Sequence, residues 1–202
     1  MNDIWDDVDR LEKESRLAMP DSGQFASTRE TQSFIEKSAI EEVLAYLHKY
    51  NGWAPTKHIQ QPDPPDAIVT LVGGTKIWCE FVSVTHQATM QAIKHRQKNN
   101  QERWLYQDWT QSTFQTRLRE LIASKEALFA RHIENRVVFR PLMLVLGSDS
   151  TMSHTGLLVG FDIKSTIFDV IAVHLGYSPA AATAGNGGYL IHIVAGNDLC
   201  PI

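Results

Sequence analysis

The chain has 202 residues, of which 43% are apolar and 21% are charged, and its formal net charge is -4. This length and composition predict a globular protein with one sizeable core, or two small ones at most. No apolar run approaches the roughly 18 residues of a membrane-spanning helix, and the acidic N-terminus lacks the order of a signal peptide, so we expect a cytoplasmic protein. Its two cysteines, Cys79 and Cys200, cannot supply a disulfide framework or a four-cysteine zinc site.

Charge is distributed unevenly along the chain. Residues 91–140 hold 10 of the 19 Lys and Arg residues but only 5 of the 23 Asp and Glu residues. A local excess of basic side chains is expected where a protein surface meets a polyanion such as nucleic acid. The alternative interpretation is a solvated helix face, with no polyanion involved.

The first 30 residues are predicted to form a helix and a linker. Apolar residues recur at helical spacing over 3–19, and Pro20 ends this segment. The helix could pack on the body of the protein, on a protein partner or on a second copy of the chain. Small and polar residues over 21–28 predict a loop. A second helix is predicted over 31–50, where Ser33 and Glu36 match a capping box and Gly52 follows.

The central part of the chain alternates between strand and helix patterns. Strand-like runs cover 53–59, 66–72 and 76–85, with a Gly73-Gly74 turn that predicts a hairpin between the last two. An apolar stripe predicts a helix over 113–133, and an unbroken apolar run predicts a buried strand over 141–147.

The C-terminal part is predicted to add a strand, a helix and a strand. These are an apolar run over 157–161, a helix over 164–175 and, after a loop of small residues, a strand over 189–194. We therefore predict an α/β fold, a mixed central sheet flanked by helices in the order helix, three strands, helix, strand. In this interpretation 1–30 is an N-terminal extension and 31–202 is one domain, with its core at 31–147 and a C-terminal extension at 148–202.

Three acidic residues stand out because of their positions in these elements. Asp66 follows Pro65 at the start of the second predicted strand, Glu80 lies within the third, and Glu36 is the acid on the apolar stripe of the preceding helix. A carboxylate inside an apolar strand is costly to bury unless it is paired, protonated or bound to a metal. Carboxylates on adjacent strands can bind Mg²⁺, which would support phosphodiester hydrolysis.

Structural roles for the same three acids stay open. Glu36 could hydrogen-bond back to Ser33, and Asp66 could cap the start of its strand. Glu80 could pair with a basic residue such as Arg117 or Arg119.

The order of elements, with Pro-Asp on the second strand and Glu on the third, resembles the PD-(D/E)xK nuclease superfamily, which has a restriction-endonuclease-like fold. The resemblance covers about 31–147. It implies a Mg²⁺-dependent hydrolase of DNA in which Asp66 and Glu80 are catalytic metal ligands, assisted by Glu36. The family's lysine, two residues after the glutamate, is replaced here by Val82.

This replacement matters for catalysis. Val82 shares its strand face with Glu80, and an aliphatic side chain cannot orient a water molecule or stabilise a developing charge. Lys76, on the same face of the strand, or Lys94, in the following segment, could supply the missing ammonium group. Otherwise catalysis is lost, and the chain is an inactive nuclease-like module that binds DNA or protein.

The basic stretch also predicts a nucleic-acid interface independently of the acids. Cations for phosphate contacts alternate with aromatic side chains on which bases could stack. The candidate residues are Lys94, Arg96, Lys98, Arg103, Trp104, Trp109 and Arg117. Alternatively, Trp104 and Trp109 anchor a helical insertion in the core. A separate alternative is a protein that binds no DNA and interacts only with other proteins.

Overall fold

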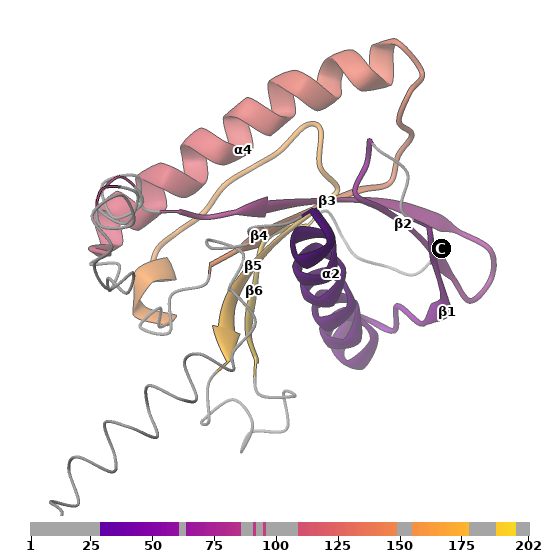
Figure 1. Ribbon diagram of the computed structural model, residues 1–202, viewed down its shortest axis with the longest axis horizontal. Coiled ribbons are helices and arrows are strands. Elements are labelled where there is room, and N and C mark those ends of the chain that lie inside the picture. Colours follow the sequence, from indigo (N-terminus) through magenta and orange to yellow (C-terminus); the bar gives the residue numbers. More distant parts are fainter. Residues whose placement is uncertain are drawn as a thin grey trace, which may run out of the picture.

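The computed structural model describes residues 29–60, 64–85, 91, 95, 109–148, 155–177 and 189–196 (Figure 1). These residues form two long helices, six strands and one short 3-10 helix. The elements in chain order are α2 (Arg29–Asn51), β1 (Pro55–Gln60), β2 (Ala67–Leu71), β3 (Lys76–Ser83), α4 (Gln111–Glu134), β4 (Leu142–Gly147), η1 (Thr155–Leu158), β5 (Val170–Tyr177) and β6 (Tyr189–Gly196).

All six strands belong to one mixed sheet, in the spatial order β1-β2-β3-β4-β5-β6. The first three strands form an antiparallel meander, β3 to β5 run parallel, and β6 returns antiparallel to β5. A parallel neighbour requires a crossover, and α4 lies in the connection between β3 and β4.

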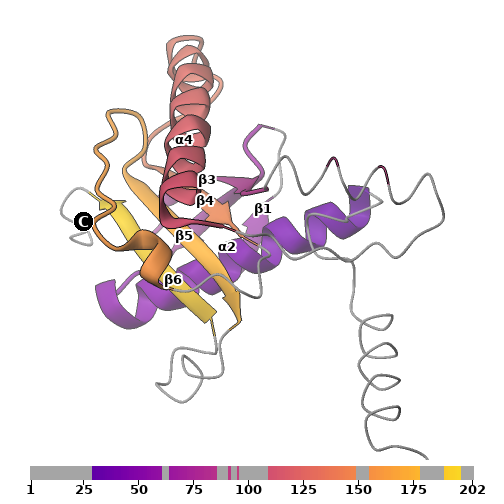
Figure 2. The same cartoon turned by 90° about the vertical axis from the view of Figure 1, so that its left-hand side faces the viewer.

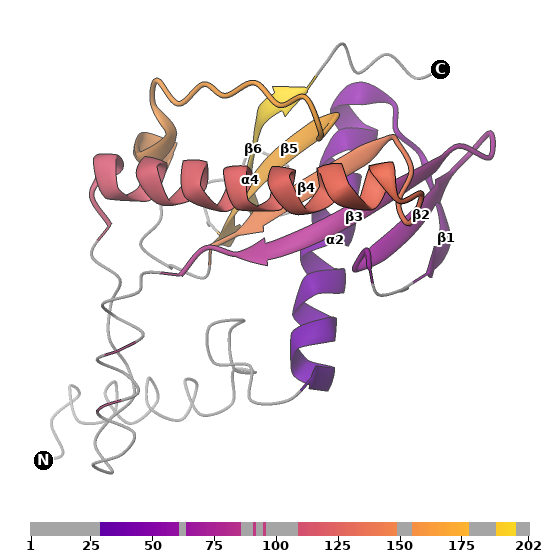
Figure 3. The same ribbon diagram turned by 90° about the horizontal axis from the view of Figure 1, so that it is seen from above.

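The two helices cover opposite faces of the sheet, as Figures 1 and 2 show. On one face, α2 buries Ile40, Val43 and Leu47 against side chains of β2, β3, β4 and β5. On the other face, α4 packs with η1. Figure 3 shows α4 lying across β4 and β5. Because side chains alternate along a strand, the central strands β3 and β4 contribute to both cores.

The predicted fold class is confirmed, including the order helix, three strands, helix and further strands. The predicted helix over 31–50 is α2, and that over 113–133 is α4. Gly73 and Gly74 close the hairpin between β2 and β3, both with positive φ, 104° and 90°.

The helix predicted over 164–175 is wrong. Residues 164–169 have no helical structure, and the run from Val170 onward is β5, the parallel neighbour of β4. Its β-branched residues fit a strand that is buried on both faces, where hydrophobic periodicity does not distinguish a strand from a buried helix. The C-terminal extension therefore adds two strands and the short helix η1, which takes the place of the strand expected over 157–161.

Several other predictions lie outside the described residues, namely the helix over 3–19, the linker over 21–28 and most of 86–108. Among the helices that are described, none combines the length and the apolar character needed to cross a membrane.

Candidate functional site

Asp66 and Glu80 face each other across the hairpin of β2 and β3. Ala67 pairs with Cys79 in the antiparallel register, so Asp66, one residue earlier, lies opposite Glu80. Ala67 and Cys79, the chain neighbours of Asp66 and Glu80, belong to the core on the α2 side. Because successive side chains of a strand point to opposite faces, Asp66 and Glu80 lie on the face that α4 covers. The backbone N–H of Phe81 donates a hydrogen bond of 2.7 Å to Asp66 Oδ2, which fixes this carboxylate beside Glu80.

A lysine from the covering helix completes the group. Lys125 Nζ on α4 lies 2.5 Å from Glu80 Oε1, and the Glu80 side chain is only 9% exposed. Lys125 is itself partly buried, with 26% of its side chain exposed. The site therefore consists of two carboxylates and one ammonium group, contributed by the start of β2, the middle of β3 and the second half of α4.

Sequence analysis missed Lys125, although the sequence contains a signal for it. Ile122 and Phe129 are buried on α4, and Lys125 lies three residues after the first and four before the second, on the same helical stripe. A cation on the buried stripe of a helix needs a partner, just as an acid inside an apolar strand does. The sequence therefore marks Lys125 as a charge that needs a partner, whereas its pairing with Glu80 follows from how α4 lies over the sheet.

Burial and the neighbouring acid together perturb Glu80. Desolvation first, and then the negative charge of Asp66, raise the pKa of Glu80 from 4.5 to about 7. The ammonium group of Lys125 acts in the opposite direction and lowers this pKa, while hydrogen bonding with Asp66 raises it further. A buried carboxyl group with a raised pKa beside a second acid is typical of sites that bind a cation or transfer a proton.

The chemistry of this pair fits a Mg²⁺ ion. Mg²⁺ is bound in proteins by one or two carboxylates, with water and substrate phosphates completing its shell. Asp66 and Glu80 supply two such groups, and a cation between them would relieve the repulsion that raises the pKa of Glu80. Within the described ranges, no three His, Cys, Asp or Glu side chains gather into a metal-binding group, so the fit depends on this pair.

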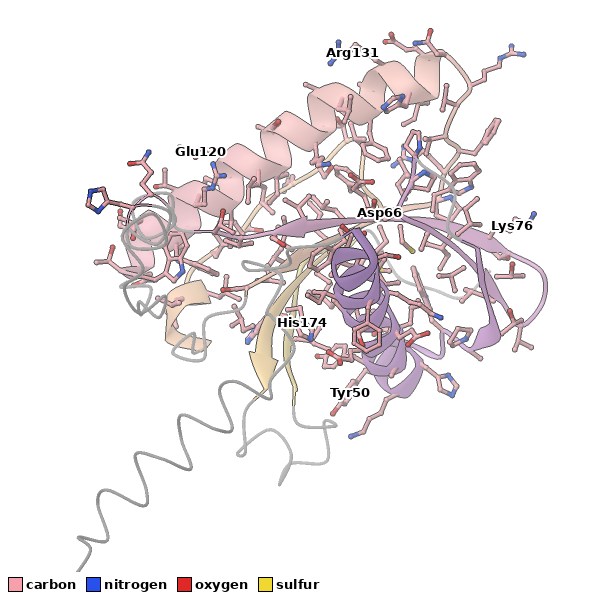
Figure 4. The ribbon with its side chains drawn as sticks, viewed as in Figure 1. Tyr50, Asp66, Lys76, Glu120, Arg131 and His174 are labelled. Carbon is pink, nitrogen blue, oxygen red and sulfur yellow. The ribbon has the colours of Figure 1, made fainter. Side chains whose placement is uncertain are left out.

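The remaining predicted members of the acidic site are placed differently. Glu36 is half-buried on α2, the helix that covers the opposite face of the sheet. Lys76 is exposed at the hairpin end of β3, and Figure 4 shows it away from Asp66. Lys94 lies outside the described residues. The ammonium group that contacts Glu80 is thus that of Lys125.

Most of the predicted nucleic-acid residues also lie outside the described ranges, namely Lys94, Arg96, Lys98, Arg103 and Trp104. Trp109 is described, and its ring packs edge-on against buried Phe114 with centroids 5.2 Å apart, which is the core-anchor alternative for this residue. Arg117 is half-buried on α4 and pairs with Glu120 at 3.1 Å.

Comparison of the chain with models of protein families, with curated proteins and with solved structures finds no match in any of the three.

Proposed function

We propose that the protein is a divalent-metal-dependent nuclease of the PD-(D/E)xK kind, whose missing motif lysine is replaced by Lys125. The observation that carries this proposal is the convergence of Asp66, Glu80 and Lys125 from three separate elements. The helix, three-strand, helix, strand order with a parallel β3–β4 pair supports the same assignment.

Each residue then has a role that follows from its chemistry. Asp66 and Glu80 would hold the ion, and Asp66 is oriented by the N–H of Phe81. The ion, when bound, supplies an activated water and neutralises charge on the phosphate. Lys125 approaches from α4, which covers this face of β3. It provides the positive charge that the aliphatic side chain of Val82 cannot provide. Its charge would stabilise the negative charge that develops on the phosphate oxygens.

The test is cleavage of labelled single-stranded DNA, duplex DNA and RNA with Mg²⁺ or Mn²⁺. We expect the wild type to cleave at least one of these polymers, and the variants Asp66→Asn, Glu80→Gln and Lys125→Met to lose at least about 100-fold in rate. Lys37→Ala is the matched control, because Lys37 is an exposed lysine on α2 that pairs only loosely with Glu41, at 3.9 Å. It should cleave as the wild type does.

Each variant is first checked for folding by circular dichroism. If the folded wild type cleaves none of the three polymers with either ion, the nuclease proposal is wrong. If Lys125→Met alone retains full activity, the assignment of Lys125 is wrong.

A further inference from the structure

The turn that ends α4 carries an arginine in an unfavourable backbone conformation. Arg136 has φ 55°, and it is the single non-glycine residue with positive φ within the described part of the chain. The N–H of Val137 bonds the carbonyl of His132, and that of Arg136 bonds the carbonyl of Ile133. These are the hydrogen bonds of a Schellman motif, whose left-handed position is usually glycine. Glycine would suit this position better, so the side chain of Arg136 needs another explanation.

Exposed apolar residues follow Arg136 directly. Val137 is 44% exposed and Phe139 is 52% exposed. The Phe139 ring lies against the half-buried Trp78 ring, with centroids 5.6 Å apart at 62°. Arg140 is held beside them by two hydrogen bonds to Asp169, of 2.7 and 3.2 Å. The exposed ring of Phe139, supported by the half-buried ring of Trp78, thus lies between Arg136 and Arg140 in the sequence.

This aromatic pair is adjacent to the proposed site. Trp78 and Glu80 point to the same face of β3, two residues apart, which separates their Cα atoms by roughly 7 Å. The charge around the turn is positive, because the three arginines at 131, 136 and 140 outnumber Glu134 and Asp169, the acid that pairs with Arg140. Figure 4 shows Arg131 above Asp66, toward the C-terminal end of α4.

We infer that Arg136, Phe139 and Trp78 form a binding surface for a single strand of nucleic acid that leads to Asp66 and Glu80. Cations beside an exposed aromatic ring match a phosphate backbone with an unstacked base, whereas the bases of a duplex are already stacked on one another. The direction toward Asp66 and Glu80 rests on the proposed function, but the binding itself does not.

The test is fluorescence anisotropy with labelled oligo-dT in EDTA, where no metal-dependent cleavage occurs. Losing one phosphate contact at about 0.1 M salt should weaken binding about fivefold, the expected result for Arg136→Gly. Phe139→Ala should weaken binding about tenfold through lost stacking. The controls are Lys37→Ala for charge and Val72→Ala for an exposed apolar residue at the hairpin tip, which is 72% exposed. Both should bind as the wild type does.

A stability measurement separates binding from damage to the fold. Glycine relieves the left-handed strain, so Arg136→Gly should unfold at a higher urea concentration than the wild type while binding more weakly. The inference is overturned if Arg136→Gly and Phe139→Ala both bind oligo-dT normally, or if a duplex binds as tightly as the single strand. The wild type should bind oligo-dT in EDTA whether or not it cleaves any polymer in the presence of metal, so the two proposals can fail separately.

Discussion

At the scale of single residues, the site is defined by charges where the pattern calls for apolar side chains. Glu80 interrupts the buried strand β3, and Lys125 interrupts the buried stripe of α4. The sequence predicted that Asp66 and Glu80 lie on neighbouring strands, because Gly73 and Gly74 predict a hairpin between these strands. It did not predict Lys125, because that contact depends on how α4 lies over the sheet, and 45 residues separate the partners.

The raised pKa of Glu80 predicts a specific loss of stability with rising pH. The unfolded chain releases this proton near pH 4.5 and the folded protein near pH 7, so the contribution of protonated Glu80 is complete below 4.5. It is lost as the pH rises through 7. Gln cannot ionise, so Glu80→Gln should avoid this loss. Between about pH 5 and pH 8, its unfolding free energy should rise relative to the wild type by about 2 kcal/mol.

Urea unfolding of the wild type and of Glu80→Gln at these two pH values measures the effect. The same comparison with Glu120→Gln is the control, because Glu120 is an exposed acid on α4 that pairs with Arg117. An equal difference between wild type and Glu80→Gln at both pH values would show that Glu80 has an ordinary pKa.

At the scale of elements, the site depends on how closely β3 lies beside β4 in the sheet. Gly147 at the end of β4 lies so near Phe81 that an added Cβ would meet the ring at 2.5 Å. Phe81 also supplies the N–H that holds Asp66. Gly147→Ala should therefore destabilise the fold by about 1–3 kcal/mol through overpacking.

A second substitution tests that explanation. Phe81→Leu shortens the ring side chain, so Gly147→Ala should cost markedly less in the Phe81→Leu background than in the wild type. Urea unfolding of the two single variants and the double variant gives the coupling. Strict additivity would mean that the cost of Gly147→Ala does not arise from the Phe81 ring.

Elements differed in how well their sequences predicted them. The helices α2 and α4 have a polar face and an apolar face, so their periodicity identified them. Every residue of β5 over 170–175 is buried and all but His174 are apolar, so the same run can be accommodated in a helix or in a strand. The run forms a strand because β4 and β6 pair with it on either side, and this pairing is a property of the tertiary structure.

At the scale of the whole molecule, the two faces of the sheet differ in what they carry. The face under α2 is a continuous apolar core, with His174 of β5 bonded to Glu42 of α2. The face under α4 carries Asp66, Glu80 and Lys125 beside its own core. One helix therefore anchors the fold, while the other both covers a core and contributes a charged group to the proposed site.

The central claim is that Asp66 and Glu80 bind a divalent cation beside Lys125. Crystals grown with Mn²⁺ test it most directly, because the anomalous signal of the metal locates the ion without reference to activity. We predict an anomalous peak between the two carboxylates of the wild type and none in crystals of Asp66→Asn. A wild-type structure with no peak there, and with Lys125 still bonded to Glu80 at saturating Mn²⁺, would contradict the account.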